Sequence, residues 1–302
     1  MLTRDQIETY HRDGFIILPD VLDPALIAEL RAVTDAIVAG ARKVTAHDEV
    51  YDLEPSHSPG DPRVRRIKKP HRVHPVFDRV MRHEAILSVL RPLIGPAIRF
   101  DESKLNMKSP EYGSAVEWHQ DWAFYPHTND DLCAVGVMMD DCGPENGPLL
   151  FIPGSHKGPV YDHHADGHFA GAIDPTACDI DFTRAVPALG RAGSISVHHV
   201  RLVHGSAMNT SNRQRRLLLY QYCAADSWPL APNGMPADWA AWRERVVCGE
   251  VDLISPRVTA VPVRLPLPPP KRAGSIYETQ RDAANLYFAP PVEARDGRPA
   301  DA

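Results

Sequence analysis

Residues 115–122 have the sequence AVEWHQDW, which places an imidazole and a carboxylate two positions apart in a run of β-forming residues. Along a β-strand the side chains at positions i and i+2 point to the same face. His119 and Asp121 can therefore supply two legs of a 2-His-1-carboxylate triad, the open-sided ligand set that suits non-haem Fe(II). A second pair with this spacing, His164 and Asp166, lies in a polar stretch between glycines, where a solvated loop is the favoured interpretation.

Runs of the same β-rich character flank this stretch on both sides, and turn signals rather than helical patterns separate them. They cover residues 97–108, 132–139, 148–154, 193–200 and 215–224. Asn146 and Gly147 form a hairpin signal between the second and third of these runs. Short strands at this spacing predict a mainly β fold, an antiparallel sandwich or barrel.

The residues before this β-rich region are typical of helices packed beside a barrel. The patterns predict helices over 4–13, 24–40, 75–82 and 83–91, a buried strand over 15–18 and a polar loop over 41–65. We therefore expect flanking α-helices in the N-terminal part of the chain.

Two long segments lack the pattern of a barrel strand. Residues 155–190 are too long for a hairpin and are expected to be an inserted functional loop. The chain after 226 is rich in Pro and Trp, and LPLPPP (265–270) cannot be a central strand. The loop and part of this tail are expected to form the substrate entrance. We expect a single domain, 1–302, with a helical N-terminal part (3–95), a barrel core (96–225) and a C-terminal wrap (226–302).

Composition excludes several classes of partner. The formal net charge of −6 gives no basic footprint for nucleic acid. No apolar run approaches the roughly 20 residues of a membrane span. A polar N-terminus and five scattered cysteines without CxxC indicate reduced thiols in a cytoplasmic protein. The one basic run, RVRRIKK (63–69), is interpreted as a solvated face. A small-molecule substrate is the expected partner, and the oligomeric state stays open.

A metal triad needs a third ligand from a distant strand, and His198, His199 and His204 are the candidates. His204 follows a predicted strand and corner, and Arg215 comes eleven residues later at the start of another strand. A guanidinium inside a barrel requires a carboxylate partner, and a small dicarboxylate cosubstrate would satisfy it. This combination favours His204 as the ligand. His198 and His199 are expected to line the pocket or to bond to the backbone.

Three motifs together resemble the phytanoyl-CoA dioxygenase-like (PhyH) family of Fe(II)/2-oxoglutarate-dependent oxygenases. They are WHQDW (118–122), NGPLLFIPGSHKG (146–158) and HGSAMNTSNRQRR (204–216). Residues 3–23 also resemble the opening helix and first strand of that family, so the resemblance covers about residues 3–225. It implies a double-stranded β-helix, that is, a jelly roll or cupin-like barrel, with N-terminal helices packed outside.

Carried over position by position, the resemblance implies that His119, Asp121 and His204 bind iron. It implies that Arg215 binds the C5 carboxylate of 2-oxoglutarate, with Ser206 as a helper, and that Lys104 touches the cosubstrate. Alternation along the strand does not choose between Arg215 and Arg216, so the family spacing makes that choice. Asp121 also separates this chain from the halogenases of the fold, which carry a small residue at that position.

The implied activity uses Fe(II), with 2-oxoglutarate and O2 as cosubstrates. It hydroxylates an unactivated C–H bond of a small or medium-sized metabolite and releases succinate and CO2. The alternatives are oxidative desaturation, cyclisation or epimerisation in natural-product biosynthesis, or a non-oxygenase cupin-like barrel that binds a metal or a sugar. An acyl-CoA substrate is disfavoured because no basic cluster is visible near the ligands. The aromatic residues beside them, which face either substrate or core, are Trp118, Trp122, Phe124 and Tyr125.

Overall fold

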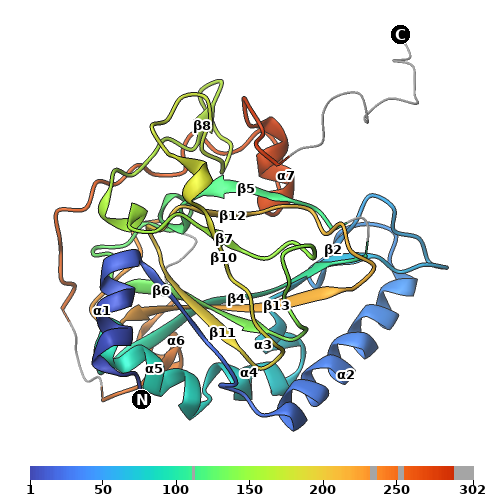
Figure 1. The fold of residues 1–302 in the computed structure, drawn as a ribbon, viewed down its shortest axis with the longest axis horizontal. Helices are drawn as coiled ribbons and strands as arrows, with labels where there is room; N and C mark the ends of the chain where they lie inside the picture. The colour runs from blue at the N-terminus through green and yellow to red at the C-terminus, as the bar shows by residue number, and fades with distance from the viewer. Residues whose placement is uncertain (111–112, 232–236, 251–254, 289–302) are drawn as a thin grey trace.

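A computed structural model describes residues 1–110, 113–231, 237–250 and 255–288. Its centre is a pair of β-sheets, with most helices on one side (Figure 1). The larger sheet has the strand order β1-β11-β6-β13-β4-β3-β2, and β14 also pairs with β4. Its members are β1 (Phe15–Leu18), β2 (Tyr51–Leu53), β3 (Val64–Lys68), β4 (Ile98–Lys108), β6 (Leu132–Met138), β11 (Ile195–His199), β13 (Arg215–Ala224) and β14 (Val246–Cys248).

The smaller sheet has the order β10-β7-β12-β5 and lies over one face of the larger one (Figure 1). It consists of β5 (Val116–His119), β7 (Leu150–Phe151), β10 (Val186–Pro187) and β12 (His204–Ser206). A separate two-stranded ribbon joins β8 (His164–Ala165) to β9 (His168–Phe169). Every strand pair is antiparallel. The predicted jelly roll with helices outside it is confirmed.

Helices cover the outer face of the larger sheet. They are α1 (Arg4–Asp13), α2 (Pro24–Gly40), α3 (Pro70–Val73), α4 (Pro75–Met81), α5 (Glu84–Ile94) and α6 (Trp239–Glu244). The predicted capping box of α1 is present, and Gly14 ends this helix in the left-handed region at φ 86°. The main hydrophobic core lies between these helices and alternate strand residues such as Leu105, Val135 and Leu218.

The inner face of the larger sheet is more polar, and strand alternation decides which residues reach it. Arg215 pairs with Lys108, and Leu219 pairs with Lys104, between β13 and β4. Because side chains alternate, all four point away from the helical core and toward the smaller sheet. An apolar cluster that includes Phe15, Phe151, Leu217 and Leu219 packs between the two sheets beside these polar residues.

Three local expectations need correction. Asn146-Gly147 is not a hairpin turn between paired strands, because β6 belongs to the larger sheet and β7 to the smaller one, so the chain crosses between sheets there. The segment 41–65 contains strand β2, because its backbone pairs with β3. The run 63–69 is not a solvated face, since Arg65 is 2% exposed and Arg66 is 9% exposed. Their guanidinium groups have partners on other segments, and these contacts offset the free-energy cost of removing the two charges from water.

Described residues of the C-terminal part pack against the barrel. Helix α7 (Ile276–Thr279) sits beside β5, and residues 265–270 form no strand (Figure 1). The five cysteines all lie in the described part and are free thiols. None of the helices that the structure describes is both long and apolar enough to span a bilayer.

Candidate metal centre

His119 and His204 meet across the smaller sheet, because His119 ends β5 and pairs in register with His204 at the start of β12. The sequence predicted Asp121 in the same strand as His119, but the strand ends at His119 and Asp121 begins a 3-10 turn (Asp121–Ala123). Gln120 between them keeps an extended backbone, φ −114° and ψ 129°. The side chains of His119 and Asp121 therefore still project to the same side.

The backbone fixes how both imidazoles face the interior. The Nδ1 atom of His119 donates to the carbonyl of Glu117 at 2.8 Å, and Nδ1 of His204 donates to the carbonyl of Leu202 at 2.9 Å. A carbonyl only accepts, so the proton of each neutral ring is on Nδ1. Each Nε2 then carries a lone pair, the state in which histidine binds a metal.

The three candidate ligands converge in a buried space. Ligand atoms of His119, Asp121 and His204 lie within 4.8 Å of one another, and the two imidazole centroids are 4.1 Å apart. Each residue is at most 4% exposed. A facial set of two imidazoles and one carboxylate fits Fe(II) and leaves positions free for other ligands.

Electrostatics put these groups in the protonation states that a divalent cation needs. Burial lowers the pKa of His119 to about 4 and lowers the pKa of His204 as well. Burial alone would raise the pKa of Asp121, but Lys104 and His198 outweigh it and hold the pKa well below its ordinary value. At neutral pH the centre therefore offers two neutral imidazoles and one carboxylate.

The contacts of Arg215 and Arg216 separate the two arginines that alternation left equivalent. Arg216 faces the helices, where Nε and Nη2 donate to the two carboxylate oxygens of Asp140 at 2.9 and 2.8 Å, and Nη1 donates to Asp35 at 2.7 Å. Arg215 faces the interior, is 3% exposed and donates through Nη2 to the carbonyl of Gly147. Its Nε has no hydrogen-bond partner in the described part of the chain. Arg215 is thus the arginine whose charge has no carboxylate.

Lys108 is a functional candidate that sequence reasoning missed. It pairs in register with Arg215, is 1% exposed, and its Nζ donates to Oγ of Ser206 at 2.8 Å. Burial, and then the charge of Arg215, lowers the pKa of Lys108 well below its ordinary value. Among the described residues neither cation makes an ion pair with a carboxylate. Nζ of Lys108 also donates to the backbone carbonyls of Ser206 and Ala207. An anion bound beside Arg215 and Lys108 would favour the charged form of this lysine. The alternation that placed Lys104 inside also places Lys108 there, four residues along the strand.

Lys104 lies at a different level, in a pocket of about 580 Å³ that opens beside Asp121. Phe124, Tyr125 and Gln221 line this pocket close to the metal centre, and Arg66 and Lys69 lie along its wall. Trp118 and Trp122 are instead packed in hydrophobic clusters. The basic run 63–69 thus supplies cations to the pocket that were not apparent from the sequence.

The tail contributes to this pocket, and the 155–190 loop does not. Ala241, Glu244, Arg245 and Ile276 are among its lining residues, and no residue of 155–190 is. The loop packs behind the metal centre instead, where Nε2 of His163 accepts from the backbone N–H of Gln120 at 2.9 Å. This contact supports the segment that carries His119 and Asp121, and the part of the loop in the substrate entrance stays a prediction.

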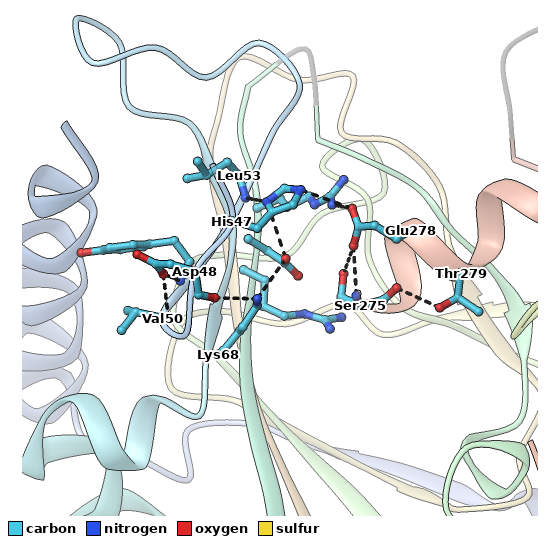
Figure 2. Close-up of polar contacts among 12 residues, drawn as sticks. His47, Asp48, Val50, Leu53, Lys68, Ser275, Glu278 and Thr279 are labelled. Atoms are coloured by element: carbon cyan, nitrogen blue, oxygen red, sulfur yellow. Dashed lines mark hydrogen bonds and ion pairs between the residues drawn. The ribbon is translucent and has the colours of Figure 1, made fainter. Parts of the chain in front are cut away.

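Helix α7 is held in place by polar contacts with the segment 47–68 (Figure 2). Glu278 caps its own helix through Oγ of Ser275 at 2.7 Å and forms an ion pair with Arg65. Its Oε1 also lies 3.7 Å from Nε2 of His47 (Figure 2). The neighbouring Tyr277 lies under the guanidinium of Arg65, 4.7 Å from the ring centroid. These contacts hold α7 against the segment 47–68.

The tail is also tied directly to strand β5. The side-chain amide of Gln280 accepts from the N–H of Glu117 at 2.9 Å and donates to its carbonyl at 3.3 Å. That carbonyl also accepts from Nδ1 of His119. The carboxylate of Glu117 in turn accepts from the N–H groups of Tyr287 and Phe288. One residue therefore connects the C-terminal segment to a candidate ligand.

The remaining histidines lie in different surroundings. His199 is turned away from the centre, near Asp130 and His156. His164 pairs with Asp162, and Asp166 pairs with Lys271, so this second pair lies outside the metal centre, as expected. His198 is buried beside Asp121 and His204 and does line the interior.

Comparisons with known proteins identify the family of this chain. The family model described as Phytanoyl-CoA dioxygenase (PhyH) matches residues 10–217. A probable alpha-ketoglutarate-dependent hypophosphite dioxygenase of Stutzerimonas stutzeri is 35% identical over 288 residues, which cover 94% of this chain and 99% of that protein. An L-proline trans-4-hydroxylase of Streptomyces griseoviridis is 30% identical over 247 residues, 75% of this chain and 88% of that protein.

Solved structures share the fold. EctD from S. alaskensis with bound Fe superposes with a TM-score of 0.65 at 24% identity, over 85% of this chain and 89% of that one. The chain belongs to the phytanoyl-CoA dioxygenase (PhyH) family, and its enzyme class is that of the Fe(II)- and 2-oxoglutarate-dependent dioxygenases.

Proposed function

We propose that this dioxygenase hydroxylates a small substrate that carries an anionic group and reaches the metal centre through the pocket beside Lys104. Succinate and CO2 would be released from 2-oxoglutarate in each turnover. The proposal depends mainly on the arrangement of three features inside the barrel: the candidate metal ligands, a pair of buried basic residues and an open pocket. The ligand set His119, Asp121 and His204 has the buried Arg215–Lys108 pair at one level and the open pocket at another.

In this proposal His119, Asp121 and His204 hold the iron. Arg215 and Lys108, with the hydroxyl of Ser206, hold the distal carboxylate of 2-oxoglutarate. When bound, iron with 2-oxoglutarate and O2 supplies the oxidising power for inserting oxygen into the substrate, and the protein contributes position and a dry interior. The two cations supply a charge-assisted, partly bidentate contact in a place where water cannot compete.

Charged side chains of both signs line the pocket, including Asp78, Asp101, Glu102 and Glu244. An anionic substrate is supported by two of its basic side chains, which have no carboxylate ion pair in the described part of the chain. Lys104 has no hydrogen bond or carboxylate ion pair in the described part of the chain, although Asp121 is close enough to raise its pKa against the effect of burial. Arg66 donates through Nε to the side chain of Asn106, a neutral partner, at 2.9 Å. An anion bound between these cations and the metal would offset the cost of burying them. These cations were not predicted from the sequence, because the run that contains Arg66 was interpreted as a solvated face.

Two substrate classes fit this arrangement. One is a small organic acid or amino acid that is hydroxylated at C–H, as the hydroxylase relative suggests. The second is hypophosphite, because the relative of that name matches nearly its whole length. Hypophosphite carries P–H bonds, and its oxidation balances as hypophosphite, 2-oxoglutarate and O2 giving phosphite, succinate and CO2. A pocket of about 580 Å³ is large for this anion, which would occupy only its inner end.

Substrate-dependent succinate release tests the proposal. The purified protein is incubated with Fe(II), 2-oxoglutarate and a panel of hypophosphite, amino acids, other small organic acids, and uncharged or cationic analogues. We expect the strongest response from an anion-bearing compound, and the product to contain one additional oxygen atom. Succinate release only with uncharged or cationic compounds would reject the anionic substrate. A product that has lost two hydrogens would instead establish desaturation.

The variant Lys104→Met distinguishes a substrate contact from the cosubstrate contact expected from sequence. A substrate contact predicts a higher KM for the substrate with an unchanged Kd for 2-oxoglutarate. If the Kd for 2-oxoglutarate rises and the substrate KM does not, Lys104 binds the cosubstrate.

A further inference from the structure

His198 is a buried histidine whose nearest carboxylate, that of Asp121, lies just beyond hydrogen-bond distance at 3.6 Å. It lies on the inner face of β11, opposite Ala134, and is 1% exposed. Neither Nδ1 nor Nε2 has a hydrogen-bond partner in the described part of the chain. An unpartnered polar group in the interior is destabilising, so its presence points to a partner gained in another state.

The ring is aimed at the carboxylate of the metal centre. Its Nε2 lies 3.6 Å from Oδ2 of Asp121, while the other oxygen, Oδ1, is the one nearer to His119, 3.9 Å from its Nε2. The ring packs between Phe151 and His204, at centroid distances of 5.2 and 4.5 Å. This packing keeps the ring inside the barrel, within a small side-chain adjustment of a hydrogen bond to Oδ2.

The surroundings of His198 differ from those of the two candidate ligand histidines. In His119 and His204 a backbone carbonyl binds Nδ1 and so directs Nε2 to the metal. No carbonyl or carboxylate binds Nδ1 of His198 among the described residues. Metal-bound histidines almost always have such a partner for the second nitrogen. His198 therefore lacks the Nδ1 partner typical of a metal-bound histidine. Its position beside Asp121 is that of a residue that orients a metal ligand.

We propose that His198 is a positioning residue that donates a hydrogen bond from Nε2 to Oδ2 of Asp121 and keeps Oδ1 directed to the metal. The proposal rests on the metal centre assigned above. A carboxylate that turned to bind through both oxygens would take a position that the cosubstrates require. A hydrogen bond to Oδ2 would prevent this rotation once the metal is bound.

Titration of the metal-free protein with Mn(II), followed by calorimetry, tests this role without any turnover. His198→Phe keeps the ring volume and removes the donor, and Mn(II) affinity should fall about 10- to 100-fold, the usual effect of losing such a contact. His198→Gln restores a donor of similar reach and should bind Mn(II) within a few-fold of the wild-type protein. Ser196→Ala is the matched control, since it changes a buried residue on the same face of β11 and should leave the affinity unchanged.

Asp121→Ala separates failure of this proposal from failure of the metal centre. If Asp121→Ala binds Mn(II) as tightly as the wild type, the centre itself is wrongly assigned. If Asp121→Ala loses the metal but His198→Phe does not, only the role of His198 is wrong.

Two further readouts distinguish a positioning role from its rivals. A merely structural His198 predicts that metal-free His198→Phe melts below the wild type. Our proposal predicts an equal or higher Tm, because two unpartnered nitrogens are removed from the interior. A fourth protein ligand predicts that the visible spectrum of the Co(II)-substituted protein changes in His198→Gln, whereas we expect the wild-type spectrum. A lower Tm with unchanged metal affinity, or a changed Co(II) spectrum, would overturn the proposal.

Discussion

Alanine at Arg215 and alanine at Arg216 should change different properties of the protein, although the two residues are adjacent on β13. Arg216 forms ion pairs with two carboxylates, whereas Arg215 has no carboxylate partner among the described residues and pairs in register with Lys108. Arg216→Ala should therefore reduce the stability of the protein alone. Arg215→Ala should reduce the affinity for 2-oxoglutarate and leave the stability of the protein alone nearly unchanged, because it also relieves repulsion with Lys108.

The magnitudes follow from the contacts. Loss of a buried charge-assisted contact costs about 2 to 5 kcal/mol. At 1.4 kcal/mol for each tenfold change, the Kd for 2-oxoglutarate should rise about 30-fold to several thousand-fold in Arg215→Ala. For Arg216→Ala we expect a loss on the order of 1–3 kcal/mol in unfolding free energy, between the values for exposed and buried pairs. Asp140 keeps a second cation, Arg31, at 3.2 Å, which moderates this loss.

Thermal unfolding with Mn(II), with and without 2-oxoglutarate, measures both effects in one assay. At 2-oxoglutarate equal to 100 times the wild-type Kd, the cosubstrate should stabilise the wild-type protein by about 2.7 kcal/mol. A 30-fold weaker Kd reduces this to about 0.9 kcal/mol in Arg215→Ala. Arg216→Ala should start from a lower Tm but retain the full increment. If Arg216→Ala loses more of the 2-oxoglutarate increment than Arg215→Ala, the assignment of Arg215 is refuted.

Three other predictions concern neighbouring residues. Lys108→Met should weaken 2-oxoglutarate binding by more than about tenfold, which is the effect of losing one charged hydrogen bond. The affinity for Mn(II) should not change. A 2-oxoglutarate affinity equal to that of the wild type in titration calorimetry would contradict this prediction. Burial lowers the pKa of His163 from 6.5 to about 3. Between these two pH values His163 is protonated only in the unfolded chain. Its contribution to the free energy of unfolding is therefore complete above pH 6.5 and should be lost as the pH falls toward 3. Urea unfolding across this range should show a loss of roughly 3 to 6 kcal/mol from this residue, and His163→Gln should flatten the profile; a profile as steep as the wild type would assign the loss to other groups. Glu278→Ala removes the carboxylate that holds α7 to Arg65, so proteases should cleave the tail faster; unchanged cleavage in a time course would show that other contacts suffice.

Sequence was a good guide where a local pattern and a tertiary contact favoured the same structure. The capping box at Thr3, the strand at 15–18 and the two-residue spacing of His119 and Asp121 all depend on near neighbours along the chain. In each case the burial of the resulting face agrees with the local preference. These elements could therefore be placed without knowledge of the rest of the fold.

The features that sequence did not give depend on which segments meet in space. Arg65 and Arg66 belong to a basic run, and only the arrival of Glu278 and Asn106 from distant segments explains their burial. Arg215 and Arg216 have the same local context, and only the carboxylates on the helical side tell them apart. Asn146-Gly147 has the composition of a hairpin, yet the strands on either side belong to different sheets.

The link from Glu117 to the C-terminal segment has a consequence for the order in which the protein is built. Ribosomes make the chain from the N-terminus, and all three candidate ligands have been synthesised by residue 204. The carbonyl that directs His119 acquires its contact with Gln280 only when residue 280 emerges, and the carboxylate of the same Glu117 acquires its backbone partners only at residues 287 and 288. A nascent chain therefore carries the ligands well before strand β5 is fastened. If these residues hold the iron as proposed, the metal should bind most tightly once residues 280–288 have docked on β5.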